Sequence, residues 1–121
     1  MSAIRPDELD SRLADGGYYL LDIRPRDDYE RGHIGGSHNV PVYDDLRAGD
    51  EDALRRHLDE IPRDREVVTI CKMGIVAKRA TRVLDDEGYD AATLLGGMSG
   101  WRGYQSGSVL YRLRSLVWKL F

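Results

Sequence analysis

The run of residues that most constrains the fold of this chain is 67–70, in which every side chain is β-branched. Such a run is typical of a β-strand that is buried on both faces of a sheet. It ends at Cys71, the only cysteine in the chain, and a short loop containing Gly74 follows. After the loop, apolar side chains recur with the period of a helix, at Val76, Ala80, Val83 and Leu84. A strand that leads through a loop into a helix predicts a parallel sheet, and such sheets bind ligands beyond the carboxyl ends of their strands.

Cys71 is therefore a candidate nucleophile at a ligand-binding edge. The thiolate is the reactive form of cysteine, and the N-terminus of a following helix favours that anion. We expect the loop amides to converge on the sulfur, with Gly74 taking a positive φ and Lys72 adding a positive charge beside it. The expected active-site loop consists of Lys72, Met73, Gly74, Ile75, Val76 and Ala77. The residues alone leave a second interpretation open, in which Cys71 is a small buried side chain at the end of a strand.

Three chemistries use a cysteine held in this way, and the neighbouring residues distinguish among them. A cysteine phosphatase needs an arginine at the position of Ala77, to grip the phosphate with two hydrogen bonds, but the arginine here is Arg79. A disulfide oxidoreductase needs a second thiol, which the sequence lacks. Sulfur transfer needs a single thiolate, which takes up a sulfane sulfur as a persulfide and passes it on. The residues therefore favour sulfur transfer.

The rest of the chain alternates between expected helices and strands. We expect helices at about 6–15, 27–32, 50–58 and 76–87, and strands at 18–23, 38–42, 67–70 and 89–95. Residues 43–49 are expected to form a polar connection, and Gly96-Gly97 a turn that leads to Trp101 in the core. The alternation predicts an α/β fold with an open parallel sheet, helices on both faces and right-handed crossovers.

Composition and charge narrow the class of protein. A chain of 121 residues has the size of one domain, and its net charge of −3 gives no reason to expect nucleic acid binding. A lone cysteine suits a reducing compartment, and the sequence shows neither a signal peptide nor a run of membrane-spanning length, so we expect a cytoplasmic protein. His33, His38 and His57 lack the spacing of metal ligands, so we expect no metal site.

Four segments resemble the motifs of the rhodanese family, in the same order and at similar separations. They are residues 20–24, residues 29–41, the loop that begins at Cys71 and residues 95–101. The resemblance extends to about Tyr104 and implies a rhodanese-like domain in residues 1–105. It also implies a sulfurtransferase without cofactor or metal. Such an enzyme moves a sulfane sulfur from a small donor such as thiosulfate to a thiophilic acceptor, for instance a protein thiol, through a persulfide on Cys71.

Asp22 interrupts the apolar run of the strand expected at 18–23. A buried carboxylate without a partner is costly, so we expect this side chain to cap a loop or to pair with Arg24. The resemblance implies a related role, because the rhodanese aspartate at this position braces the active-site loop. It also implies that His33 is structural and takes no part in the chemistry.

Residues 106–121 have no counterpart in the rhodanese resemblance and are expected to form a separate amphipathic tail. The apolar side chains that share one helical face, or lie beside it, are Val109, Leu110, Leu113, Leu116, Val117 and Leu120. The charged ones are Arg112, Arg114 and Lys119. A basic amphipathic helix can lie on a membrane surface or on a partner protein, and the simpler alternative is docking on its own domain. The hypothesis that competes with an enzyme is thus a non-catalytic rhodanese-fold module, which docks a partner or a membrane through residues 109–121.

Overall fold

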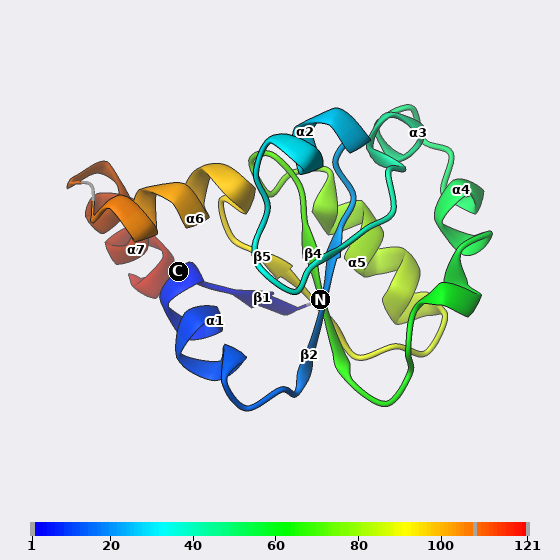
Figure 1. The fold of residues 1–121 in the computed structure, drawn as a ribbon, viewed down its shortest axis with the longest axis horizontal. Helices are drawn as coiled ribbons and strands as arrows, with labels where there is room; N and C mark the ends of the chain where they lie inside the picture. Colours follow the sequence, from blue (N-terminus) through cyan, green and yellow to red (C-terminus); the bar gives the residue numbers. More distant parts are fainter. Residues whose placement is uncertain (1, 108, 121) are drawn as a thin grey trace.

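The fold is built on a five-stranded sheet with the strand order β1-β5-β4-β2-β3 (Figure 1). The computed structural model describes residues 2–107 and 109–120, so Met1, Ser108 and Phe121 of the expected segments lie outside the described residues. The strands are β1 (Ser2–Ile4), β2 (Tyr18–Asp22), β3 (His38–Asn39), β4 (Glu66–Ile70) and β5 (Ala91–Leu94). Each neighbouring pair is parallel, which confirms the α/β class predicted from the alternating pattern.

Helices cover both faces of this sheet. They are α1 (Pro6–Leu13), α2 (Arg26–Arg31), α3 (Tyr43–Arg47), α4 (Asp52–Arg55), α5 (Ala77–Asp86), α6 (Gly97–Ser106) and α7 (Val109–Leu120), with a 3-10 helix η1 (Leu58–Glu60). One buried cluster joins the sheet to α3, α4 and α5 through side chains such as Leu46, Leu54 and Leu84. The other joins it to α1 and α6 through Leu9 and Trp101, so Trp101 lies in the core as expected. Figure 1 shows α1, α6 and α7 gathered on one side of the molecule and α3, α4 and α5 on the other.

The centre of the sheet is β4, whose last four residues, 67–70, are fully buried. The hydroxyl of Thr69 lies 2.8 Å from that of Thr81, which in turn lies 2.7 Å from that of Thr93. The Thr69 hydroxyl also donates a hydrogen bond to the carbonyl of Ala77, over 3.1 Å. Because a buried hydroxyl without a partner is costly, this network specifies how the first turn of α5 sits on the sheet.

The structure differs from the sequence-based expectation at several elements. The edge strand β1 was not expected, since among its residues only Ile4 is buried and three residues show no clear period. The segment 43–49 contains α3, and the helix expected at 50–58 is reduced to α4 and η1. The turn expected at Gly96-Gly97 is the start of α6. Its glycines disfavour a helix, and the burial of Met98 and Trp101 compensates for that cost. None of the described helices has the length and apolar character needed to cross a membrane.

Candidate active site

The loop between β4 and α5 closes around the sulfur of Cys71. The N–H of Gly74 donates to Sγ over 3.1 Å and the N–H of Ala77 over 3.4 Å. Backbone amides that converge on one atom make an anion-binding nest, and Ala77 opens α5 at the positive end of the helix dipole. Cys71 is 1% exposed, so these loop amides, rather than water, are the hydrogen-bond partners of its sulfur. The convergence of loop amides expected from the sequence is present.

Two glycines allow this close packing of backbone around the thiol. Gly74 has a φ of +85°, and a Cβ there would lie 2.9 Å from the amide nitrogen of Gly96. Gly97 has a φ of +55°, and a Cβ there would clash with the carbonyl oxygen of Cys71. Both positions therefore require glycine, because they combine a left-handed conformation with a backbone contact that leaves no room for a side chain.

The N-terminal turn of α6 holds the start of the loop from the other side. The N–H of Met98 donates to the carbonyl of Cys71 over 2.9 Å, and the N–H of Ser99 donates to the carbonyl of Lys72 over 3.0 Å. These amides belong to the first turn of α6, where backbone N–H groups have no partner within the helix. The loop is thus fixed between the first turns of two helices, α5 and α6.

A pocket of about 250 Å³ opens onto Cys71. Its lining is formed by Tyr43, Arg47, Cys71, Met73, Ile75, Val76 and Arg79. The guanidinium of Arg79 donates to the carbonyls of Leu46 and Arg47, over 2.8 and 3.0 Å, which links α5 to α3. Two arginines therefore border the pocket that contains the thiol, and a small anion fits such a pocket.

Three of these pocket residues, Tyr43, Arg47 and Arg79, were not predicted as site residues from the sequence. Tyr43 and Arg47 lie in the segment expected to be a polar connection, and Arg79 was considered only as an arginine out of register for a phosphatase. These residues approach Cys71 because α3 packs against α5. No local pattern in the sequence predicts that packing. The one available signal was the position of Arg79 on the helix that follows the cysteine.

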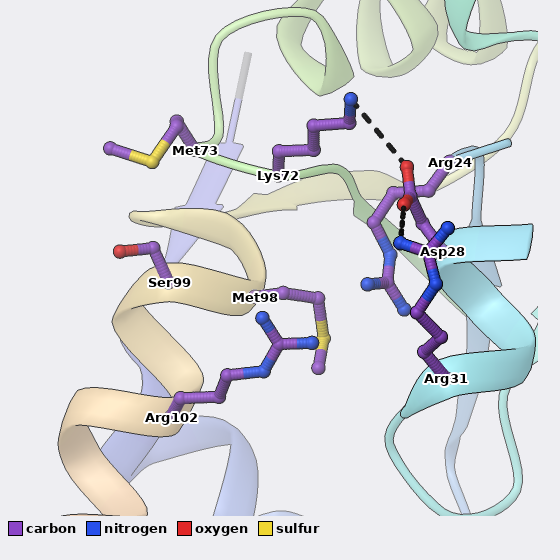
Figure 2. A pocket seen from close by; sticks show the side chains of 8 residues that line it. All are labelled: Arg24, Asp28, Arg31, Lys72, Met73, Met98, Ser99 and Arg102. Carbon is purple, nitrogen blue, oxygen red and sulfur yellow. Dashed lines mark hydrogen bonds and ion pairs between the residues drawn. The ribbon is translucent and has the colours of Figure 1, made fainter.

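A second pocket, of about 390 Å³, lies beside the first and shares Met73 with it. Figure 2 shows its lining, which consists of Arg24, Asp28, Arg31, Lys72, Met73, Met98, Ser99 and Arg102. Lys72 Nζ lies 3.5 Å from Asp28 Oδ2 and 4.9 Å from the centre of the Tyr43 ring. The structure therefore places Lys72 in this neighbouring pocket, with its charge engaged by Asp28. Arg31 pairs with the same carboxylate over 3.0 Å. Because Asp28 is the one acidic residue among the described lining residues, positive charges outnumber negative ones in this pocket.

Asp22 and Arg24 form a buried ion pair, in which Arg24 also lines the second pocket. Arg24 Nε and Nη2 donate to the carboxylate over 3.0 and 2.9 Å, and the two residues are 2% and 0% exposed, Arg24 and Asp22 respectively. Arg24 Nη2 also donates to the carbonyl of Gly32 over 2.7 Å, and Asn39 donates to the Arg24 carbonyl over 2.9 Å. The pairing expected from the sequence is present. It fixes the end of β2 to the C-terminal end of α2, the helix that presents Asp28 to Lys72.

His33, for which the rhodanese resemblance implies a structural role, packs against Tyr29. Its ring stacks on that of Tyr29 with the centroids 3.9 Å apart, and Nδ1 of His33 lies 2.8 Å from the Tyr29 carbonyl oxygen. Within residues 2–107 and 109–120, no three side chains of histidine, cysteine, aspartate or glutamate are grouped so that they could hold a metal ion.

The parallel sheet, the amide-lined cysteine loop and the buried Asp22–Arg24 pair define a class of protein. A family model described as the rhodanese-like domain matches residues 5–104. The chain therefore belongs to the rhodanese-like domain family, as the resemblance of its motifs predicted. Among solved structures, a rhodanese-related protein from Thermoplasma volcanium has the same fold, with a TM-score of 0.72 at 23% identity, covering 89% of this chain and 95% of that one.

Two curated relatives carry different names. The chain is 33% identical over 102 residues to the HTH-type transcriptional regulator Rv0324 of Mycobacterium tuberculosis, covering 83% of this chain and 41% of the regulator. It is 36% identical over 72 residues to the adenylyltransferase and sulfurtransferase UBA4 of Eremothecium gossypii, covering 59% of this chain and 16% of that protein. The chain thus spans less than half the length of either relative.

Proposed function

We propose that the protein is a sulfurtransferase that carries a sulfane sulfur as a persulfide on Cys71. The observation that carries this proposal is the sulfur itself, which accepts hydrogen bonds from two loop amides and faces a pocket bordered by two arginines. Membership of the rhodanese-like family and the name of the UBA4 relative support a sulfurtransferase role in general. The chain has a single cysteine, and this chemistry needs only one.

The proposed donor is thiosulfate or a similar small anion. The Cys71 thiolate attacks the outer sulfur of thiosulfate, a new S–S bond forms on Cys71, and the original S–S bond breaks so that sulfite leaves with the electron pair. A thiophilic acceptor, such as cyanide or a protein thiolate, then attacks the outer persulfide sulfur, and the Cys71 thiolate is regenerated. The amides of Gly74 and Ala77 stabilise the anionic sulfur in each step, and Arg47 and Arg79 attract the anionic donor.

The test measures sulfur uptake by the intact protein. Incubation with thiosulfate is expected to add the mass of one sulfur atom to the wild-type chain, and cyanide is expected to remove it as thiocyanate. Cys71→Ser is expected to abolish both signals. A Cys71→Ser protein that still forms thiocyanate at the wild-type rate would overturn the proposal.

A matched pair of arginine variants tests how the donor is held. Arg47→Ala is expected to raise KM for thiosulfate, whereas Arg56→Ala is expected to leave it unchanged, because Arg56 is exposed and pairs only with Asp50, over 3.7 Å, among the interactions of the described residues. Equal KM values for the two variants would show that the Cys71 pocket does not bind the donor through Arg47.

The second candidate function is a non-catalytic binding module. Two exposed apolar side chains on the loop favour it, since Met73 is 54% exposed and Ile75 is 71% exposed, and such side chains can contact a partner protein. The Rv0324 relative, named a regulator, points the same way. A folded wild-type protein that takes up no sulfur from thiosulfate would favour this module over the enzyme.

Two further parts of the proposal concern the type of reaction and the compartment. A phosphatase is disfavoured, because Ala77 stands where the phosphate-gripping arginine is needed. We place the protein in the cytoplasm, because Cys71 must stay reduced between turnovers and that compartment keeps thiols reduced.

A further inference from the structure

The helix α7 presents its apolar face away from the domain. Its large aliphatic side chains are all at least half exposed, at 53–70% of their surface: Val109, Leu110, Leu113, Leu116, Val117 and Leu120. The buried residues of α7 are instead Tyr111 and Ser115, on the opposite side of the helix. An isolated exposed leucine needs no explanation, but a continuous helical face of aliphatic side chains marks an interaction site.

The orientation of α7 is fixed by the contacts of its other face. The hydroxyl of Tyr111 donates to Asp7 Oδ1 over 3.0 Å, and its ring lies 5.5 Å from that of Tyr104 in α6. The Trp118 ring packs so closely on α6 that a Cβ added at Gly96 would lie 3.1 Å from it. Figure 1 shows α7 at the edge of the molecule, beside α6 and α1. The helix therefore docks on its own domain, which was the simpler of the expected alternatives. It does so through the face opposite its aliphatic face.

Positive charges border the aliphatic face along one edge. With 3.6 residues per turn, Arg112 and Lys119 lie along this edge, whereas Arg114, at the other edge, turns to α6, where its Nη1 donates to Ser99 Oγ over 3.5 Å. Residues 109–120 contain no acidic side chain, although the chain as a whole has a net charge of −3. The aliphatic face is thus bordered by positive charge, although the chain as a whole is acidic.

We propose that α7 seats the domain on the surface of an anionic lipid membrane, with its aliphatic face between the acyl chains and its cations at the headgroups. An apolar helical face edged by lysine and arginine is the pattern of helices that lie in the membrane interface. A second copy of the chain is a poorer occupant. Pairing two α7 helices through this face would bring Arg112 and Lys119 near the cations of the partner helix, with no acidic side chain on α7 to offset them.

The experiment uses the full chain and sedimentation with vesicles. Binding is expected with vesicles that contain phosphatidylglycerol and is expected to be at least tenfold weaker with pure phosphatidylcholine. It should also weaken as salt is raised, because salt screens the attraction between cations and headgroups. Leu113→Ser/Leu116→Ser is expected to abolish binding at every salt concentration, since it removes apolar contact while changing only exposed side chains.

Two double variants isolate the role of charge. Arg112→Glu/Lys119→Glu is expected to weaken binding to anionic vesicles at least tenfold. The matched control is Lys78→Glu/Arg82→Glu, which makes the same change of charge at exposed positions of α5, on the other side of the sheet, and is expected to bind as the wild type does. Circular dichroism and the rate of sulfur transfer check that each variant is folded.

Three results would overturn the proposal. The first is an intact protein that does not bind anionic vesicles. The second is an equal loss of binding in the α5 control, which would indicate attraction of the whole molecule by charge alone. The third is a stable dimer in solution that Leu113→Ser/Leu116→Ser dissociates, which would assign the face to a second copy.

Discussion

The buried pair of Asp22 and Arg24 offers the sharpest test of what holds the site in place. Asp22→Asn keeps the shape of the side chain and removes its charge, which leaves the Arg24 guanidinium, 2% exposed, without its counter-ion. Breaking one side of a buried ion pair in this way costs about 3–5 kcal/mol, a large part of the total stability of a single domain. For a chain of this length we expect the Tm to fall by about 10 °C or more.

Urea unfolding followed by circular dichroism measures this loss of stability. The matched control is Glu30→Gln, which breaks the Arg26–Glu30 pair; its side chains are 79% and 58% exposed, so the cost should be about 1 kcal/mol or less. The double variant Asp22→Asn/Arg24→Gln carries no unpaired buried charge and should be more stable than Asp22→Asn alone. Equal losses in Asp22→Asn and Glu30→Gln, or a double variant no better than the single one, would refute the reasoning.

Two further predictions concern α6. Gly97→Ala is expected to abolish sulfur transfer and to lower the free energy of unfolding by about 2 kcal/mol or more, because the new Cβ meets the carbonyl of Cys71 at a positive φ. The control Gly17→Ala, where a Cβ has nothing within 4 Å, should be neutral. Activity assays and urea unfolding measure both effects, and an active, stable Gly97→Ala protein would contradict the prediction. The hydrogen bond from Tyr104 to Asp10 raises the pKa of the Tyr104 phenol from 10.0 to about 12. This bond therefore stabilises the folded protein below pH 10.0 and is lost as the pH rises towards 12. Tyrosinate absorbance, assigned by its loss in Tyr104→Phe, should shift to lower pH in Asp10→Asn, and an unchanged titration would contradict this assignment.

The central part of the fold was predictable because its signals are local. The β-branched run 67–70 and the helical period that follows it depend only on burial, and they appear as β4 and α5 nearly where expected. The edge strand β1 was missed because a strand with one buried residue has no period to detect. The helix α6 was missed because its glycines argue against a helix, and the burial of Met98 and Trp101 outweighs them.

In the candidate site, too, the features that depend on local sequence were predictable and those that depend on long-range packing were not. The amides around Cys71 follow from a strand, a glycine and a helix in sequence, so their convergence was predictable. The position of Lys72 was not, because Asp28 and Tyr43 lie far from it in the chain and draw its side chain into the second pocket. Arg47 was missed for the same reason, since only the packing of α3 on α5 brings it to the pocket of Cys71. For α7 the period was visible in the sequence, but which face meets the domain was decided by Tyr111 and its partners on α1 and α6.

Apart from the bond from the Thr69 hydroxyl to the Ala77 carbonyl, the hydrogen bonds that fix the cysteine loop come from backbone N–H groups. Those of Gly74 and Ala77 reach the sulfur, and those of Met98 and Ser99 reach the carbonyls of the loop. Apart from the positions that require glycine, these bonds place no demand on the identity of the side chains they come from. The exposed side chains of the loop, Lys72, Met73 and Ile75, can therefore be exchanged to suit a different donor or acceptor while the sulfur stays in place. This separation makes the loop a suitable target for redesigning which molecules supply and receive the sulfur.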